Sequence, residues 1–333
     1  MISYIGGKSQ IGTWIRDYIP NDIETYVETF GGMFWVFFRM DDTKYPNLKK
    51  VVYNDFNPLN YNLFKNVRGS NYESFGELLL NEDCQGYGDE YDVKTVDDLT
   101  NKFKSYQKEI FAPDFKITDE NSQDVAKKYA FVLTQVFSGT MPEKGKYMNF
   151  KGQYKPKFRT FREKLTTEKY DSFQKKLEKI TFCENLDFGD VINKYDSEKS
   201  YFYVDPPYWK TESYYSNHDF DRKDHERLCN QLKQIKGKFS LSYYDFDLLS
   251  KWLPKNKFVW EQKEFTKQAG TKKDGTRNKG TELLIMNYKK PKSSDDKIKQ
   301  IEKISPKINV KPLKELAKIG DKVNQNSNKF FNL

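Results

Sequence analysis

The chain has 333 residues, of which 37% are hydrophobic, 32% charged and 16% aromatic, and its formal net charge is +9. Because disordered chains lack aromatic residues, the 26 Phe and 23 Tyr predict a folded protein with a largely aromatic core. No apolar run approaches the roughly 20 residues of a membrane span, and the first residues lack a signal-peptide core, so we expect a cytoplasmic protein. Three widely separated cysteines and only two histidines argue against a disulfide framework, a zinc site and a histidine triad.

The first elements alternate between strand and helix patterns. A strand at 26–30 runs into Gly31-Gly32, and an apolar stretch of helix length follows at 33–40. A second strand at 51–53 ends in Asn54-Asp55. A strand, a glycine turn, a helix and a second strand with an acidic end form the opening of a nucleotide-binding βαβ unit, so the sequence predicts an α/β fold.

The remaining elements follow from apolar periodicity and glycine content. Residues 70–124 are acidic with mixed helical stretches, and 137–158 combine three glycines with Lys and Tyr, which indicates a loop or hairpin. A glycine-rich loop is expected at 270–280 and a basic extension at 291–333. Further helices are expected at 59–67, 126–136, 161–178 and 222–235, and further strands at 180–183, 201–204, 238–243, 257–260 and 282–288.

Basic and acidic residues are segregated along the chain. Residues 289–333 carry 12 Lys against 5 acidic residues, while 141–163 and 255–280 carry 7 and 8 basic residues against 2 and 3 acidic ones. Residues 70–124, in contrast, hold 14 acidic residues and 5 Lys. This segregation predicts a basic face for a polyanion such as nucleic acid, although lysine enrichment of a solvated surface explains the counts equally well.

The strongest motif is Asp205-Pro206-Pro207-Tyr208, directly after the strand at 201–204. Ligands of open α/β sheets bind at the carboxyl ends of strands. Because two prolines remove two backbone donors, the motif offers a carboxylate, carbonyls and an aromatic ring. Such an acceptor-only platform fits the exocyclic amino group of a planar base and draws its lone pair out of conjugation, so that the nitrogen can attack a methyl group. The alternative is an ordinary turn at the end of a strand.

Two further segments suggest a nucleotide pocket. Gly31 and Gly32 let backbone approach a ligand closely, and Asp55 is placed to accept hydrogen bonds from a ribose. At the N-terminus, Lys8 could pair with a carboxylate and Tyr4 could pack on a base. A plain structural turn and a solvated chain start are the alternatives.

With these motifs in this order, the sequence resembles the Dam-like (D12 class, alpha-group) DNA adenine-N6 methyltransferases over about residues 2–288. The resemblance implies a class I S-adenosylmethionine-dependent methyltransferase fold with a Rossmann-like core at 1–66 and 173–290. It also implies an inserted, mostly helical target-recognition domain at 67–172, followed by the basic extension at 291–333. That extension either adds sequence-independent DNA affinity or docks as a helix on the core.

The resemblance assigns roles to individual residues. Catalysis would fall to Asp205, Pro206, Pro207 and Tyr208, with the Asp205 carboxylate and the Pro206 carbonyl accepting the N6 hydrogens of a flipped-out adenine and Tyr208 holding its ring. The S-adenosylmethionine site would comprise Tyr4, Gly6, Gly7, Lys8, Glu28, Thr29, Phe30, Gly31, Gly32, Asp55, Phe56, Asp187, Phe188 and Asp205. DNA would be bound by Lys144, Lys146, Tyr147, Asn149, Lys151, Lys155, Lys272, Lys273 and Arg277.

The implied partner is double-stranded DNA, with no membrane and no metal, and a cognate restriction endonuclease is a further candidate. The host would be a bacterium or a virus-infected cell. Three features depart from the family pattern. Phe34 stands where a second Gly is expected, Thr29 replaces a usual Pro, and 134–140 lacks the Asn- and Arg-rich version, so the target GATC does not follow. The alternatives are an RNA or protein amino-group methyltransferase and a catalytically weakened nucleic-acid-binding homologue, which Phe34 permits.

Overall fold

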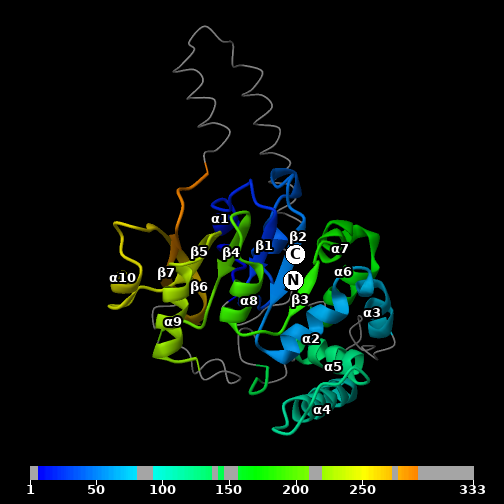
Figure 1. Ribbon diagram of the computed structural model, residues 1–333. Coiled ribbons are helices and arrows are strands. Elements are labelled where there is room, and N and C mark those ends of the chain that lie inside the picture. The colour runs from blue at the N-terminus through cyan, green and yellow to red at the C-terminus, as the bar shows by residue number, and fades with distance from the viewer. Residues whose placement is uncertain are drawn as a thin grey trace.

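The computed structural model describes residues 7–80, 93–136, 142–145, 157–209, 220–271 and 277–291. Within them one seven-stranded sheet has the order β3-β2-β1-β4-β5-β7-β6 (Figure 1). The first five strands are parallel, and β7 pairs antiparallel with both β5 and β6. The strands are β1 Thr25–Glu28, β2 Lys50–Asn54, β3 Phe182–Glu184, β4 Ser200–Val204, β5 Lys238–Tyr243, β6 Val259–Thr271 and β7 Arg277–Met286. The predicted α/β class is confirmed, and the sheet is consistent with a methyltransferase fold.

Alternating side chains divide the core between the two faces of the sheet. On β1, Tyr26 packs in one cluster and Val27 in the other. On β4, Tyr201 and Tyr203 share the face of Tyr26, and Phe202 points the other way. The tyrosine-rich face carries polar contacts, such as the 2.9 Å hydrogen bond between the hydroxyls of Tyr203 and Ser242. The Tyr26 face thus carries a row of tyrosine and serine hydroxyls, whereas the Val27 face is mainly apolar and has a buried polar contact between Tyr243 and His225.

Short helices cover both faces. Helices α8 (Phe188–Tyr195), α9 (Arg222–Leu232) and α10 (Leu249–Trp252) pack on the Val27 face, and α8 and α9 lie in front of the sheet in Figure 1. On the Tyr26 face lie α1 (Gly12–Arg16) and the 3-10 turn η1 (Phe37–Arg39). The sheet thus forms the middle of three layers.

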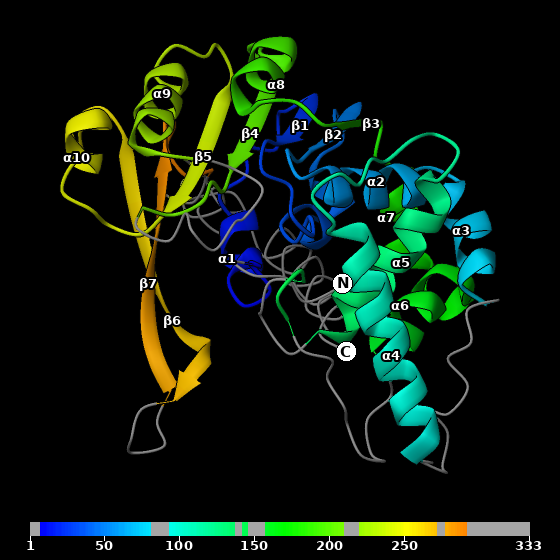
Figure 2. The same cartoon turned by 90° about the horizontal axis from the view of Figure 1, so that it is seen from below.

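Most of the chain between β2 and β3 is helical and gathers beyond the β3 edge of the sheet (Figures 1 and 2). The core cluster of the Tyr26 face continues without interruption into these helices through Phe64, Tyr129 and Phe173. The predicted helical character of this region is confirmed, while its boundaries as a separate domain stay a prediction. Its elements are α2 Pro58–Val67, α3 Asn71–Leu80, α4 Val93–Ile110, α5 Ser122–Gln135, α6 Lys157–Thr166, η3 Glu168–Tyr170 and α7 Asp171–Glu178, while the turn η2 Asp42–Lys44 precedes β2.

Two predicted helices were wrong, and one predicted strand is longer than expected. The helix expected at 33–40 is a series of turns ending in η1, because Gly32 and Phe34 have φ of 49° and 56° and so cannot continue a right-handed helix. The helix expected at 161–178 is interrupted at Thr167, whose backbone is extended. The strand expected at 257–260 continues to Thr271, so most of the described part of the loop at 270–280 belongs to a long hairpin that extends beyond the other strands (Figure 2).

Two further predictions lie largely outside the described residues. Of the hairpin or loop expected at 137–158, the structure describes only 142–145 and the first turn of α6, and of the extension at 291–333 only its first residue. Among the helices of the described ranges, none is long and apolar enough to cross a membrane.

Candidate active site

The candidate site lies where the chain order of the parallel sheet reverses. From β1 the chain goes to β2 on one side, whereas β4 pairs with the other side of β1. In open α/β sheets this reversal leaves a crevice at the carboxyl ends of the two strands. β1 ends at Glu28 and β4 ends at Val204, directly before Asp205.

Four polar side chains meet at this edge, and we call them the carboxylate cluster: Lys8 and Glu282, which are buried, and Asp205 and Tyr208, which are partly buried. Lys8 Nζ lies 2.7 Å from Asp205 Oδ1 and 3.5 Å from Glu282 Oε1. The Tyr208 hydroxyl lies 3.1 Å from Asp205 Oδ1 and also contacts Glu282 Oε1. The Lys8 ammonium lies 5.0 Å from the centre of the Tyr208 ring. The pairing of Lys8 with a carboxylate, suggested by the sequence, is present.

Strand periodicity explains why these residues meet. Asp205 follows Tyr203 at an interval of two, so it continues the polar face of β4. Glu282 lies two residues before Leu284, which packs in the same core cluster and pairs in register with Ser242. The polar positions of the two strands therefore come together at the same edge, although they are separated by more than seventy residues of sequence.

Burial dominates the electrostatics of the carboxylate cluster. The pKa values of Asp205 and Glu282 are raised because burial disfavours the ionised carboxyl more than Lys8 stabilises it. Burial alone would lower the pKa of Lys8, but the two carboxylates together raise it. Glu28, at the end of β1, is buried and accepts hydrogen bonds from the Tyr26 hydroxyl at 2.6 Å and the Phe37 amide at 2.9 Å. Its pKa is nevertheless raised to about 8 by burial.

The glycine turn after β1 is held tightly against β2. A Cβ on Gly31 would lie 2.4 Å from the Tyr53 ring, so only glycine fits there. The Gly31 amide donates to the Asn54 carbonyl at 2.7 Å, and the Gly32 amide donates to Asp55 Oδ2 at 2.7 Å. Asp55 also accepts from the Asn57 amide at 2.8 Å. Asp55 therefore fixes the turn, and burial raises its pKa to about 6.

Phe34 replaces the glycine that the sequence comparison expected, yet it keeps a glycine-like backbone. Its φ of 56° lies in the left-handed region, which costs a residue with a side chain roughly 1–2 kcal/mol. The ring is fully buried and packs 4.7 Å from the Phe37 ring and 5.2 Å from the Tyr53 ring. Aromatic packing thus offsets the backbone strain, and the ring points into the core.

Beside the glycine turn lies a pocket of about 330 Å³, and because several residues expected to hold the adenosine part of a cofactor line it, we call it the adenosine pocket. Phe56 contributes a ring that is 47% exposed. The buried Thr29 hydroxyl has no hydrogen-bond partner among the residues that the structure describes, so a ligand in the pocket could satisfy it. The lining comprises Thr29, Phe30, Phe56, Leu186, Asp187, Phe188, Pro207, Phe220, Asp224 and Arg227.

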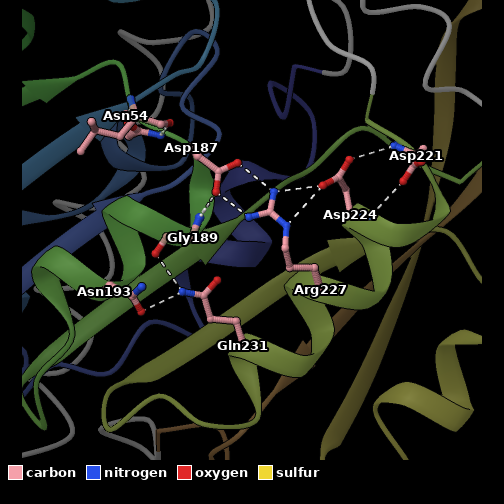
Figure 3. A network of polar contacts seen from close by, with 9 residues as sticks. Asn54, Asp187, Gly189, Asn193, Asp221, Asp224, Arg227 and Gln231 are labelled. Carbon is pink, nitrogen blue, oxygen red and sulfur yellow. Dashed lines mark hydrogen bonds and ion pairs between the residues drawn. The ribbon is translucent and has the colours of Figure 1, made fainter.

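An ion-pair network forms one wall of the adenosine pocket (Figure 3). Asp187 is the N-cap of α8 and accepts from the Gly189 amide at 2.8 Å. Arg227 of α9 donates to both oxygens of Asp187, at 2.6 and 2.8 Å, and to Asp224 at 2.9 Å. Its guanidinium lies 3.8 Å from the centre of the Phe188 ring. The network joins α8 to α9 and fixes the Asp187 carboxylate and the Phe188 ring together.

Comparison of the sequence with known proteins assigns the chain to a family. The family of D12 class N6 adenine-specific DNA methyltransferases matches residues 4–268. The chain belongs to this family. It is also similar to the type II methyltransferase M.CviBI of Paramecium bursaria Chlorella virus NC1A, with 21% identity over 290 residues, which are 86% of this chain and 99% of that protein. Methyltransferases of the D12 family act on DNA and in general use S-adenosylmethionine.

In this D12 family member the structure brings together many of the predicted site residues. Asp205, Tyr208 and Lys8 belong to the carboxylate cluster, and Pro206 is buried beside it. The predicted residues that line the adenosine pocket are Thr29, Phe30, Phe56, Asp187, Phe188 and Pro207. The predicted residues that hold the turn without lining this pocket are Glu28, Gly31, Gly32 and Asp55.

Other predicted residues lie apart or outside the described residues. Gly7, Lys144 and Arg277 are exposed. Tyr4 and Gly6 are outside the described ranges, as are most predicted DNA contacts: Lys146, Tyr147, Asn149, Lys151, Lys155, Lys272 and Lys273. Within the described ranges, no group of three or more His, Cys, Asp or Glu is arranged to hold a metal ion.

Three residues of the D12 site were missed by the sequence analysis. Glu282 enters the carboxylate cluster from β7, and Arg227 enters the pocket wall from α9. Asn54 joins three strand ends, because its amide donates to the Thr29 carbonyl at 2.8 Å and its oxygen accepts from the Leu186 amide at 3.0 Å. A polar residue at the end of a buried strand is a signal for Asn54 and Glu282, whereas Arg227 resembles any charged helix residue.

Proposed function

We propose that this protein is a site-specific DNA adenine-N6 methyltransferase that transfers a methyl group from S-adenosylmethionine to an adenine flipped out of double-stranded DNA. The observation that carries the proposal is the position of Asp205. Its carboxylate is held by Lys8 at the carboxyl end of β4, immediately before two prolines and next to the adenosine pocket. Membership of the D12 family supports the adenine target.

The residues around the adenosine pocket fit the proposed methyl donor. The exposed Phe56 ring and the Phe188 ring suit a purine, and the Thr29 hydroxyl and the Asp187 carboxylate are polar groups beside it. We assign ribose binding to Asp55, which lies in the turn that follows β2. The carboxylate cluster contains two carboxyl groups and one lysine, so its polarity suits a cation such as a sulfonium.

S-adenosylmethionine supplies an electrophilic methyl group on a positively charged sulfur. The Asp205 carboxylate and the Pro206 carbonyl accept the two N6 hydrogens of adenine, which makes the nitrogen lone pair available. The bound methyl donor would supply the carbon of the new N–C bond, and the electron pair of the broken C–S bond would stay on sulfur. The nitrogen then loses one proton, and Asp205 is the carboxylate already hydrogen-bonded to it. Extrusion of the adenine costs a few kcal/mol, and stacking on Tyr208 offsets part of this.

We assign target recognition to the helical segment 67–172, with the methyltransferase core at 1–66 and 173–290. Lysines of 144–155, Lys272 and Lys273 between β6 and β7, Arg277 and the extension at 291–333 would supply phosphate contacts. A partner endonuclease would cut the same site when it is unmethylated. The alternative of a catalytically weakened homologue was based on Phe34. Because Phe34 packs in the core and is not among the residues that line the pocket, it gives no reason to expect weakened cofactor binding.

The proposal is tested by incubating the full chain with methyl-labelled S-adenosylmethionine and either duplex DNA or structured RNA. We expect label in DNA, on adenine N6, and a single sequence motif when the DNA is read by methylation-sensitive sequencing. Label in RNA and not in DNA would establish the RNA alternative instead. Cofactor binding without label in either nucleic acid would identify a homologue that has lost catalysis.

A further inference from the structure

The hydrogen atoms of the carboxylate cluster can be counted. The Tyr208 hydroxyl contacts one oxygen of Asp205 and one of Glu282, but it carries a single hydrogen. If both carboxyls were ionised, one of the two contacts would place two oxygen lone pairs against each other. If Glu282 is protonated, it donates to the Tyr208 oxygen while Tyr208 donates to Asp205. Both contacts are then hydrogen bonds.

The charges of the cluster also indicate that Glu282 is protonated. Lys8 is one cation between two carboxyl groups, and its contact with Asp205 is shorter than its contact with Glu282. The Lys8 and Glu282 side chains are only 7% and 2% exposed, so water cannot compensate a second negative charge there. Without a bound ligand the cluster therefore favours one additional proton on its two carboxyl groups. Glu282 is the carboxyl with the weaker ion pair to Lys8, so it is the one that holds this proton.

A methyl donor would change this charge balance. The proposed transfer brings the sulfonium within bonding reach of a nitrogen that is held by Asp205, so its positive charge lies at the cluster. Asp205 is 17% exposed and Tyr208 is also partly exposed, so the cluster reaches the surface at the end of β4. A sulfonium at this position neutralises the surplus carboxylate, whereas the thioether product carries no charge and does not.

We propose that Glu282 is a positioning residue that holds a proton in the cofactor-free enzyme and gives it up when the sulfonium binds, so that the site selects the charged methyl donor over its neutral product. This inference rests on the proposed function. It implies that the affinity for S-adenosylmethionine rises with pH, because the ionised form of Glu282 binds the cation. The affinity for S-adenosylhomocysteine is expected to stay flat.

Other titratable groups surround Glu282 and belong in the same account. Lys8 faces it from the N-terminal segment, and Asp205 and Tyr208 face it from the end of β4. Tyr203 of β4 and Tyr244 after β5 interact with it electrostatically. Glu28 of β1 interacts with Lys8 and Asp205 and is the other buried carboxyl whose proton could be displaced.

The experiment is isothermal titration calorimetry of the full chain with S-adenosylmethionine and with S-adenosylhomocysteine, from pH 6 to pH 9, in two buffers of different ionisation enthalpy. We expect the wild type to release about one proton on binding S-adenosylmethionine and to gain affinity about tenfold per pH unit where the proton is exchanged. Glu282→Gln mimics the protonated carboxyl. It is expected to lose this proton release and about tenfold or more of the preference for the charged ligand.

Glu28→Gln tests the competing assignment, since it removes another buried carboxyl that interacts with Lys8 and Asp205, and it is expected to keep the proton release of the wild type. Release that disappears in Glu28→Gln and persists in Glu282→Gln would overturn the assignment to Glu282. Binding of S-adenosylmethionine by the wild type without proton release, or with a flat pH profile, would overturn the inference and leave the proposed function standing. Failure of the wild type to bind S-adenosylmethionine would instead contradict the proposed function itself.

Discussion

The carboxylate cluster and the adenosine pocket lie along the carboxyl edge of the same parallel strands, but they handle charge in opposite ways. In the cluster, Lys8, Asp205 and Glu282 are 7%, 17% and 2% exposed. In the pocket wall, the side chains of Asp187 and Arg227 are 35% and 47% exposed. Burial raises the pKa values of the cluster carboxyls, whereas the hydrogen bond that Arg227 donates to Asp187 is the main cause of the raised pKa of Arg227.

This difference predicts a division of labour. Fixed charges in a water-poor environment act strongly on charge that changes during a reaction, because little solvent screens them. Half-exposed ion pairs are screened and contribute on the order of 1 kcal/mol or less. Substitutions in the cluster should therefore change the turnover number, and substitutions in the pocket should change ligand affinity alone. Three variants test this division, and a fourth, Glu28→Gln, measures the cost of burying a carboxyl beside the cluster.

The largest effect is expected for Asp205→Ala. Removal of one of two acceptors for the amino group should lower the turnover number on the order of 10²-fold or more, because this interaction strengthens in the transition state. The measurement is single-turnover methylation of duplex DNA, with circular dichroism to verify the fold. Asp245→Ala, which removes an exposed acid after β5, is the control. Near-normal turnover by a folded Asp205→Ala enzyme would contradict the catalytic assignment.

Glu28→Gln tests the cost of buried charge on the cluster side. The folded-state pKa of Glu28 is raised from 4.5 to about 8, so its stabilising contribution is present below pH 4.5 and is lost as pH rises through 8. Gln keeps an oxygen for Tyr26 and Phe37. We expect the variant to gain free energy of unfolding over the wild type as pH rises from 5 to 8.5, by on the order of a few kcal/mol.

Urea denaturation at several pH values measures this gain. Glu24→Gln provides the comparison, because Glu24 is exposed and its substitution should leave the pH profile unchanged. Parallel pH profiles for Glu28→Gln and the wild type would mean that the Glu28 carboxyl is not an ionised burden in the folded protein.

Asp55→Asn tests the residue that joins the glycine turn to the pocket. One oxygen remains to accept from Gly32 or Asn57, but the charged acceptor for the ribose is lost. We expect the Michaelis constant for S-adenosylmethionine to rise about tenfold, with a much smaller change in turnover number. Calorimetric binding provides the direct measurement, and Asp41→Asn, which also removes a carboxylate that accepts a backbone hydrogen bond, is the control. Unchanged cofactor affinity would rule out the ribose role.

The smallest effect is expected for Arg227→Lys. Lysine keeps the charge but cannot form the two-point contact with Asp187 or lie flat on Phe188. Because the pair is half-exposed, we expect only about a two- to fivefold loss of cofactor affinity and no change in turnover number. Arg222→Lys at the start of the same helix should have no effect. A large fall in turnover number would show that the pocket wall acts on the reaction as well.

The sequence predicted those parts of the site that depend on local order. Asp205 to Tyr208 and the Gly31-Gly32 turn each follow a recognisable strand, so their place at the edge of the sheet could be inferred from periodicity. Glu282 could not be placed in this way. Its contact with Lys8 depends on the pairing of β7 with β5, which no local pattern encodes.

The two fold errors near the site have physical causes of the same kind. The apolar run at 33–40 has helical spacing. However, tertiary packing of Phe34 fixes its backbone in the left-handed region, which prevents an α-helix from forming there. The strands of the β6–β7 hairpin are polar toward their tips, and cross-strand pairing extends them well beyond the apolar stretch that the sequence analysis used. In both places contacts between residues distant in sequence, and not local propensity, determined the secondary structure.

The buried ring of Phe34 also connects two functions that would otherwise be separate. It lies 5.9 Å from the ring of Phe64 in α2 and 6.1 Å from that of Phe38, which stacks at 4.8 Å on Phe173 of α7. The turn beside the pocket is thus braced by α2 and α7, the two helices through which the chain enters and leaves the segment 67–172 assigned to target recognition. A shift of those helices on DNA would be transmitted to the backbone of Phe34, so we expect DNA and the methyl donor to alter each other's affinity by the same factor.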